Sequence, residues 1–186
     1  MQLRKMTGQD MRFLNDIDAT LDVVEYLHVD HTFEGLTNRW LVEPRPLRPG
    51  KSLANTLSDD DLFDIRQVAE GAEDGFAMVA DHDGQLVAAL VARNLPQEQL
   101  IELLTIRVDF DFRRQGIATA AMFQLVNHAK EQEARAVRVV VTTDNAPACH
   151  MFAKLGFVLS GIDTRRKTNH DLVKEQASLV WYLPMD

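Results

Sequence analysis

The stretch of sequence that decides the fold is Ile101–Ala118, IELLTIRVDFDFRRQGIA. Its apolar first half belongs to a strand predicted over Leu100–Val108, and a short polar turn leads into a helix that begins within RRQGIA at 113–118. The first turn of a helix leaves backbone N–H groups without partners, and the helix dipole adds partial positive charge there. Gly116 and Ala118 remove side-chain bulk, and two arginines add charge. The segment therefore predicts a cradle for a pyrophosphate, with an ordinary helix start that exposes its arginines as the alternative.

A second informative segment is Thr142–Phe157, TTDNAPACHMFAKLGF, which follows a buried strand predicted over Ala136–Val141. A short helix is predicted over Pro147–Leu155, because proline suits a first helical turn and Gly156 suits a C-terminal cap.

Together the two segments resemble the GNAT superfamily of N-acetyltransferases. The first matches the family's Arg/Gln-x-x-Gly-x-Gly/Ala motif at Arg113, Gly116 and Ala118. The second matches its later pattern, Asn-x-x-Ala-x-x-(Leu/Met)-Tyr-x-Lys-x-Gly-Phe, at Asn145, Ala148, Met151, Phe152, Lys154, Gly156 and Phe157. Both motifs at this separation are more specific than either alone. The sequence departs from the family at Phe152, where a tyrosine is common.

The resemblance implies an α/β (α+β) fold. Its core would be a mixed, mainly antiparallel sheet of about seven strands, splayed between the fourth and fifth strands and flanked by about four helices. We expect residues 1–186 to form a single N-acetyltransferase domain, with acceptor-side helices and a loop over 1–75 and the acetyl-CoA-binding core over 76–186.

Local patterns predict the remaining elements. Apolar spacings of three and four predict one or two helices over Gln9–Leu27, whereas three prolines predict a loop over His28–Gly50. Ser58 and Asp61 resemble a capping box at the start of a helix. A further helix is expected at Gln115–Glu131, and strands at Gln2–Met6, Phe76–Ala80, Leu86–Ala92, Phe157–Ile162 and Ser178–Leu183.

The resemblance also implies how acetyl-CoA, the co-substrate, would bind. Its pyrophosphate would rest on the amides of Arg114–Ala118, and its pantetheine arm would pair with backbone around Ile106–Val108. The Val108 amide would donate to the thioester carbonyl, and Asn145 would reach the pantetheine arm. The expected cofactor-binding residues are Ile106, Val108, Arg113, Arg114, Gln115, Gly116, Ile117, Ala118 and Asn145. No metal is expected.

Acetyl transfer to an amine needs a base for the ammonium group and sometimes an acid for the CoA thiolate. Glu102 matches the position of the catalytic glutamate in the histone-acetylating members, and strand spacing predicts that it shares a face with Ile106 and Val108. It would act directly or through a water, and the alternative is a solvated glutamate at a strand end. Phe152 has no proton to give, so either water protonates the thiolate or another group replaces the tyrosine.

Two other residue groups could suggest chemistry, but we favour a structural role for each. Cys149, the only cysteine, invites a covalent acyl-cysteine role, but no Cys–His–Asx arrangement is evident and a buried packing residue is expected. His28 and His31 are spaced like metal ligands, but no further cluster accompanies them.

Composition bounds the function. A chain of 186 residues with 46% hydrophobic and 26% charged residues fits one globular domain, and it excludes collagen and long coiled coils. The first fifteen residues have no apolar core of a signal peptide, and no apolar run reaches bilayer length, so we expect a cytoplasmic protein without membrane contact. A lone cysteine fits a reducing compartment.

The net charge of −8 is uneven along the chain. Residues 1–100 carry 9 basic and 18 acidic residues, a balance of −9, and residues 101–186 carry 11 and 10, a balance of +1. The missing basic excess argues against nucleic acid as a partner. The asymmetry favours a cationic acceptor on one side and an anionic cofactor on the other, with a solvated acidic surface as the alternative. Asp59–Asp61 could attract an ammonium group, although an acidic run also stabilises a helix N-terminus.

Within the superfamily, the sequence resembles the streptothricin acetyltransferases at Asn145–Cys149, Ala153–Phe157, Ser160–Asp163 and Val180–Tyr182. Their acceptor is an amino group on the β-lysine part of a cationic antibiotic. We therefore predict acetyl transfer to a primary amine of a small cationic molecule, such as a streptothricin-like antibiotic, a polyamine or an amino-acid derivative. The alternatives are a protein N-terminal or lysine acetyltransferase and a catalytically weak CoA-binding module. The protein is expected to be a monomer or a homodimer.

Overall fold

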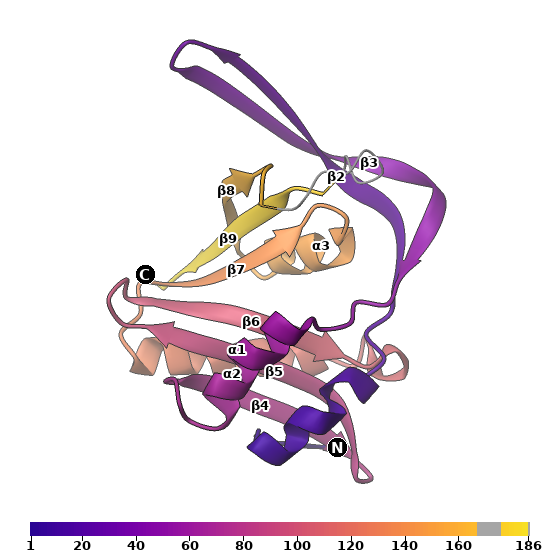
Figure 1. The fold of residues 1–186 in the computed structure, drawn as a ribbon, viewed down its shortest axis with the longest axis vertical. Helices are drawn as coiled ribbons and strands as arrows, with labels where there is room; N and C mark the ends of the chain where they lie inside the picture. Colours follow the sequence, from indigo (N-terminus) through magenta and orange to yellow (C-terminus); the bar gives the residue numbers. More distant parts are fainter. Residues whose placement is uncertain (167–175, 186) are drawn as a thin grey trace. The chain divides into compact units, whose positions relative to one another are not determined.

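The computed structural model describes residues 1–166 and 176–185. A seven-stranded sheet has the order β1-β4-β5-β6-β7-β9-β8, and β2 and β3 form a separate two-stranded sheet (Figure 1). The seven strands are β1 (Gln2–Lys5), β4 (Gly75–His82), β5 (Gln85–Leu95), β6 (Leu100–Val108), β7 (Ala136–Thr142), β8 (Val158–Asp163) and β9 (Ser178–Pro184). The helices are η1 (Gly8–Asp16), α1 (Asp59–Ala69), η2 (Phe110–Phe112), α2 (Ile117–Glu131) and α3 (Ala146–Lys154), of which η1 and η2 are 3₁₀ segments. The expected mixed, mainly antiparallel α/β sheet is confirmed.

The chain divides into two compact units that interleave along the sequence. The first unit contains Met1–Thr20, Ala54–Val139 and the last residues from Leu183, and the second contains Leu21–Leu53 and Val140–Tyr182. Neither unit ends at residue 75, where we expected an acceptor side to give way to a cofactor core. The assignment of residues 1–186 to a single domain stays a prediction.

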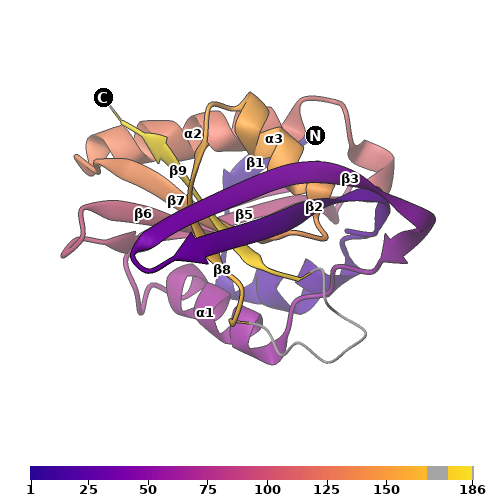
Figure 2. The same ribbon diagram turned by 90° about the horizontal axis from the view of Figure 1, so that it is seen from above.

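In the first unit, two helical layers cover opposite faces of the sheet (Figure 2). On one face, η1 and α1 pack over β4 and β5, around Met11, Leu14, Ile65 and Val91. On the other face, α2 covers the strands, and Ile117 packs with Val87 and Val108. These side chains alternate along the strands because successive residues of a strand point to opposite faces. The sheet is therefore buried on both sides in this unit.

The predicted hairpin and capping box are both present. β4 and β5 join through Asp83 and Gly84, whose φ angles of 52° and 82° are left-handed, as a tight two-residue turn requires. At α1, the Ser58 hydroxyl accepts from the Asp61 amide and the Asp61 carboxylate accepts from the Ser58 amide. Aspartate therefore serves in place of the usual glutamate or glutamine.

The parallel pairing between β6 and β7, the fourth and fifth strands of the sheet, is short. Its registered pairs run from Leu100 opposite Ala136 to Leu103 opposite Val139. These are the two strands between which the fold was expected to splay. The predictions for α2, α3, β7, β8 and β9 agree with the structure to within about two residues at each end.

The prediction for residues 21–50 is wrong. Instead of a helix that reaches Leu27 and a loop over His28–Gly50, the structure has a long antiparallel hairpin of β2 (Leu21–Glu34) and β3 (Thr37–Leu53). Leu21, Val24 and Leu27 have helical spacing, but the same segment also has the alternation of a strand. The burial follows the strand, because Val23 and Leu27 are buried and Val24 is exposed. Only η1 remains of the predicted helix.

The prolines of β3 are tolerated because of where their nitrogens point. The Leu27 amide donates to the Thr143 carbonyl, outside the hairpin, so the backbone N–H and C=O groups of Leu27 point away from β3. Pro44, which is opposite Leu27, and Pro46, two residues further, therefore also face the outer edge. A proline at that position removes no hydrogen bond from the β2–β3 ladder, which is why proline is confined to edge strands.

The second unit places α3 against β2 and pairs β8 with β9 in antiparallel register. The Thr143 amide donates to the Ala177 carbonyl, and the Thr143 hydroxyl accepts from the Ala177 amide. In the part of the chain that the structure describes, no helix is long and apolar enough to cross a membrane.

Candidate active site

The C-terminal half of β6 presents backbone groups at an edge of the strand. The Asp109 amide donates to the Val87 carbonyl of β5 at 2.8 Å, so odd-numbered residues here direct their backbone groups toward β5. Val108 and Ile106 then direct their N–H and C=O groups away from β5, because successive residues alternate. The geometry suits the expected pairing of this segment with a pantetheine arm, whose amides need facing donors and acceptors.

A β-bulge changes which side chains share a face of β6. Leu103 pairs with Ala92 and Thr105 with Val91, so Leu104 is the extra residue on β6. Before the bulge, Glu102 pairs with Arg93 on the α1 face. After it, Ile106 and Val108 lie on the α2 face. The expectation that Glu102 shares a face with Ile106 and Val108 is therefore wrong, because a one-residue insertion moves all later side chains to the opposite face.

Glu102 lies between two arginines. Its Oε2 accepts from Arg93 Nε and Nη2 at 2.7 Å, and its Oε1 accepts from Arg138 Nη2 at 2.8 Å. The side chain of Glu102 is only 13% exposed. Arg93 also approaches Asp64 of α1, and Arg138 approaches Glu98. Glu102 thus links β5 and β7 at the place where β6 and β7 pair.

The N-terminus of α2 differs from those of α1 and α3. Its N-cap is Gly116, at a left-handed φ of 81°, and no described side chain caps it. The first turn carries no acidic residue. By contrast, Ser58 caps α1 and Asn145 caps α3. The first amides of α2 are therefore the ones that side chains leave available to an external anion.

The loop before α2 is shaped for close approach. A Cβ built on Gly116 meets no atom within 4 Å, so the space over the N-terminus of α2 is open. Arg114 is also left-handed, with φ 60°. Arg113 is held by the chain itself: its Nε donates to the Val108 carbonyl at 3.1 Å and its guanidinium lies over the Phe110 ring. Gln115 donates to the Asp111 carbonyl.

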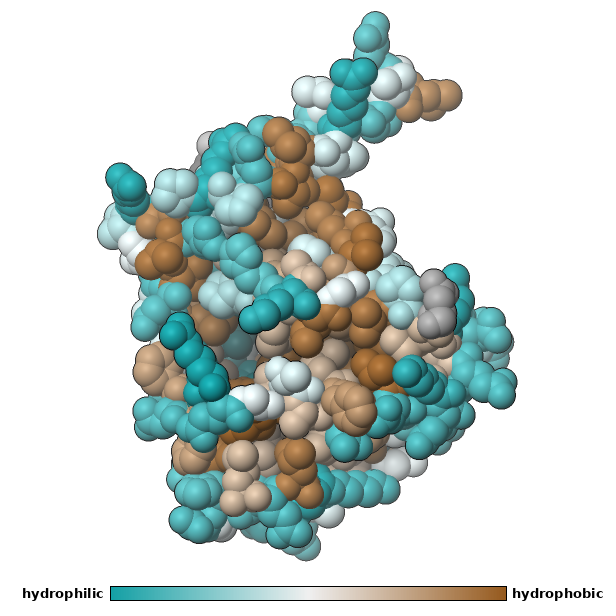
Figure 3. All heavy atoms as spheres, turned by 180° about the vertical axis from the view of Figure 1, so that it is seen from behind, coloured by the Kyte–Doolittle hydropathy of each residue, from teal (hydrophilic) through white to brown (hydrophobic). Residues whose placement is uncertain are grey.

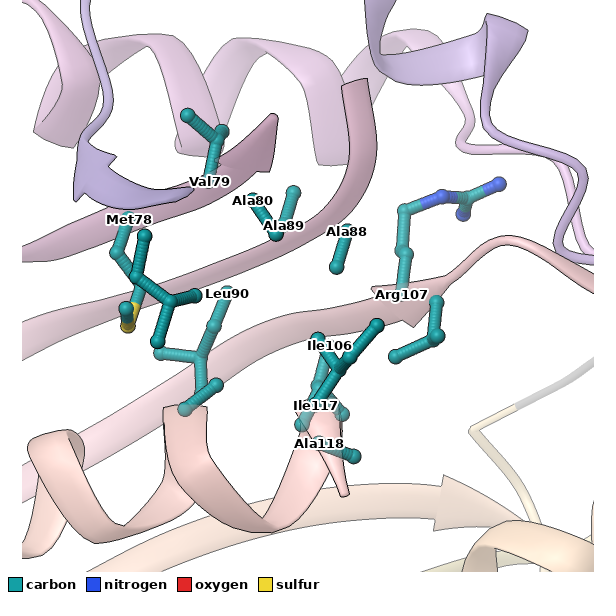
Figure 4. Close-up of a pocket in the computed structure, with 13 residues that line it drawn as sticks. Met78, Val79, Ala80, Ala88, Ala89, Leu90, Ile106, Arg107, Ile117 and Ala118 are labelled. Carbon is teal, nitrogen blue, oxygen red and sulfur yellow. The ribbon is translucent and has the colours of Figure 1, made fainter. Parts of the chain in front are cut away.

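The helix that follows is fixed by packing beneath β6. Figure 4 shows Ile106 and Ile117 pointing toward one another from β6 and α2, with Ala118 beside them, and Arg107 pointing away. Ile117 is buried at the first position of α2. The structure thus brings together Ile106, Val108 and 113–118 within the first unit, and their binding of a cofactor stays a prediction.

Asn145 and Phe152 lie in the second unit. The Asn145 side-chain oxygen accepts from the Ala148 amide at 3.2 Å, which caps α3. The Asn145 side-chain nitrogen does not take part in this cap. That Asn145 reaches a pantetheine arm stays a prediction. Phe152 is buried and packs edge-to-face on Phe157 with 5.0 Å between ring centroids. Its ring therefore serves the core of this unit.

Cys149 has the packing role that we preferred. It is buried, and burial together with the nearby Asp144 raises the pKa of its thiol to about 12. Because the thiolate is the nucleophile, this thiol is inert near neutral pH. Among the described residues, no group of three or more His, Cys, Asp or Glu side chains is arranged to hold a metal ion.

Sequence reasoning missed Arg107. Its side chain is on the α1 face of β6, only 4% of the residue is exposed, and its Nε has no hydrogen-bond partner in the described chain. Burial lowers the pKa of this guanidinium from its usual value, while Asp61 opposes that shift. An arginine within the mostly apolar segment Leu103–Val108 was the available signal.

Comparison with known proteins gives a family. Residues 37–157 match the model of the acetyltransferase (GNAT) family, which is more than half of the chain. A curated relative is the streptothricin acetyltransferase of Streptomyces lavendulae, which is 26% identical over 165 residues, 88% of this chain and 84% of that protein.

Solved structures share the fold. The nourseothricin acetyltransferase structure has a TM-score of 0.81 at 22% identity and covers 100% of this chain and 98% of its own. A putative streptothricin acetyltransferase from Bacillus anthracis, solved in complex with acetyl coenzyme A, has a TM-score of 0.76 at 18% identity and covers 98% of both chains.

Proposed function

Because the chain belongs to the acetyltransferase (GNAT) family, we propose that it transfers the acetyl group of acetyl-CoA to a primary amine of a small cationic molecule of the streptothricin type. The observation that carries this proposal is the open N-terminus of α2 next to the outward-facing backbone of Val108. The names of the relatives point to the same acceptor class.

The residues of the first unit support the binding of an anionic cofactor. The amides of 114–118 are proposed to hold the pyrophosphate, because they converge at a helix N-terminus that lacks an acidic cap. Arg114 would add charge, while Arg113 fixes the loop through the Val108 carbonyl. The backbone of Ile106 and Val108 is proposed to align the pantetheine arm.

Acetyl transfer also requires that protons be removed from the acceptor nitrogen and that developing negative charge be stabilised. The ammonium group of the acceptor first loses a proton, and the resulting amine attacks the thioester carbonyl of acetyl-CoA. A C–N bond forms as the C–S bond breaks and the CoA thiolate leaves. The nitrogen then loses its second proton, which neutralises the thiolate directly or through water. The Val108 amide is proposed to donate to the thioester oxygen, where negative charge develops. A thiolate is a tolerable leaving group near neutral pH, so an acid at the Phe152 position is dispensable.

Glu102 remains our candidate for the proton acceptor, acting through a water. Glu102 Oε2 already accepts from two nitrogens of Arg93, but Oε1 accepts from Arg138 alone and keeps a second lone pair for a water. The proposed route therefore does not require the ion pairs to break. It does require that the carboxylate act from the α1 face of β6.

The test measures free thiol released when purified protein is incubated with acetyl-CoA and a panel of amines: streptothricin, polyamines, amino-acid derivatives and basic peptides. We expect the fastest release with a small cationic amine. Faster turnover of a peptide N-terminus or lysine would replace this proposal with protein acetylation. Acetyl-CoA binding without thiol release above background for any amine would make the protein a binding module instead.

A further inference from the structure

The outer part of the β2–β3 hairpin lacks the partners that a two-stranded sheet needs. β2 has 14 residues and β3 has 17, and their residues 31–41 are all exposed. The exposed side chains include Phe33 at 73%, Leu36 at 100% and Leu41 at 54%. Figure 3 shows a small hydrophobic group on one side of this end of the hairpin, among hydrophilic and neutral side chains. Two strands alone are at best marginally stable in water, and a third strand with an apolar face is normally required.

One face of this outer part is mostly apolar, with Asn38 opposite Phe33 as its polar member beside His31. Strand alternation and the register place Val29, His31 and Phe33 of β2 on the same face as Trp40 and Val42 of β3. The rings of His31 and Trp40 are stacked with centroids 3.7 Å apart, and His31 also contacts Phe33. The opposite face carries Leu41 and the charged side chains of Asp30, Arg39, Glu43 and Arg45, of which Arg45 pairs with both Asp30 and Glu43.

The backbone of β3 is ready for another strand at its outer edge. The outward direction of Leu27 fixes the alternation, so Asn38, Trp40 and Val42 direct their amides and carbonyls away from β2. Pro44 and Pro46 end this stretch, because they have no N–H to offer. An unpaired edge of this kind is a template for a further chain.

Charge selects which chain fits. Consider β3 paired antiparallel with β3 of another molecule about a two-fold axis at Leu41. Arg39 is then opposite Glu43 of the partner subunit, and on the other side of the axis Glu43 is opposite Arg39 of the partner subunit. Trp40 is then opposite Val42 of the partner subunit, and both have outward backbone groups. By contrast, β2 paired symmetrically about Asp30 or Thr32 sets Asp30 opposite another carboxylate, either its own copy or Glu34 of the partner subunit.

We propose that a second copy of this chain binds the outer edge of β3, in antiparallel orientation about a two-fold axis at Leu41. The result is a four-stranded sheet in which the apolar faces of both hairpins are continuous. Each Trp40 and Val42 amide donates to the facing carbonyl of the partner subunit. The dimer supplies the strands whose absence leaves the outer hairpin exposed in one chain.

The test is sedimentation equilibrium of the full-length protein over a range of concentrations. We expect a dimer of about twice the 21.0 kDa chain mass. Arg39→Glu and Glu43→Arg should each weaken the dimer about tenfold or more, because each sets like charges opposite one another. The double variant R39E/E43R restores opposite charges and should restore the dimer.

Arg48→Glu is the matched control, because it makes the same charge change on β3 outside the Arg39–Glu43 stretch. It should leave the dimer unchanged. Circular dichroism confirms that each variant is folded. A wild-type protein that sediments at the mass of one chain overturns the proposal. So does a dimer that tolerates both charge reversals, or one that the double variant fails to restore. Because the readout is mass, this test is independent of the acetyl-transfer proposal.

Discussion

Replacing Glu102 by glutamine tests whether its carboxylate holds the β5–β6–β7 junction. The glutamine side chain would keep one oxygen as an acceptor, but its NH₂ group would face an arginine that is also a donor. Arg93 or Arg138 would then lose a charged partner at 2.7 or 2.8 Å.

The magnitude follows from burial. Removing one partner of a fully buried ion pair costs about 3–5 kcal/mol, and exposed pairs cost at most about 1 kcal/mol. Glu102 is 13% exposed, but Arg93 and Arg138 are 28% and 23% exposed. We therefore expect E102Q to lower the free energy of unfolding by about 2 kcal/mol, between those limits.

The assay is urea unfolding at neutral pH with Glu98→Gln as the control. Glu98 also pairs with Arg138, but at 3.5 Å and with 52% of its side chain exposed. E98Q should change the free energy of unfolding by less than about 0.5 kcal/mol. Equal effects of the two substitutions, or a wild-type midpoint for E102Q, would refute the structural role.

The pH–rate profile of the same variant separates this role from base catalysis. If Glu102 only positions β6, E102Q lowers kcat/KM by a similar factor at each pH. If Glu102 also accepts the proton, E102Q loses the most activity at low pH, where the ammonium form of the amine dominates. An unchanged profile shape in E102Q eliminates the base role proposed above.

Three further predictions follow from the structure. Gly116→Ala should raise the KM for acetyl-CoA several-fold, because the added methyl group intrudes over the α2 amides. Gly84→Ala is the control: it has nearly the same φ (82° against 81°) and also lies in open space, so it should lower stability alone. Equal KM values for the two variants would count against the phosphate cradle. Arg4 and Thr7 lower the pKa of Asp10 to about 2, so the Asp10 carboxylate stabilises the fold above its unfolded pKa near 4 and loses that contribution as pH falls through 2. The difference in unfolding free energy between wild type and Asp10→Asn should therefore shrink between pH 4 and pH 2. A constant difference in acid denaturation would contradict this. Cys149 should resist thiol reagents in the native protein at neutral pH and react only on unfolding, and rapid native labelling would show that the thiol is accessible.

The helices α2 and α3 were predictable because their signals are local. The start of α2 requires a glycine that adopts positive φ, an apolar stripe fixes the buried face of the helix, and the sequence displays both. The motif around Asn145 likewise sits where a cap is needed at the start of α3. In such segments, the residues that determine the backbone are within a few positions of one another.

The failures all involve partners far away in sequence. Leu21–Leu27 satisfies both helical and strand spacing, and pairing with β3 decides between them. The bulge at Leu104 depends on register with β5, and nothing in the mostly apolar segment Leu103–Val108 marks it. The double contact of Glu102 depends on Arg93 and Arg138, which are 9 and 36 residues away. A rule based on spacing along one strand therefore could not place the Glu102 side chain.

The charge asymmetry also acquires a narrower meaning. Several carboxylates of residues 1–100 are engaged in the fold: Asp10 binds Arg4, Asp61 completes the cap of α1, and Asp64 approaches Arg93. The acidic run at Asp59–Asp61 is thus explained by helix capping and the helix dipole without any ligand. For the proposed cationic acceptor, there remains the summed electrostatic field of the exposed carboxylates, which acts over a distance and is weakened by salt. Selectivity for one amine over another must then come from contacts at the reacting nitrogen, since a long-range field attracts every cation of equal charge equally.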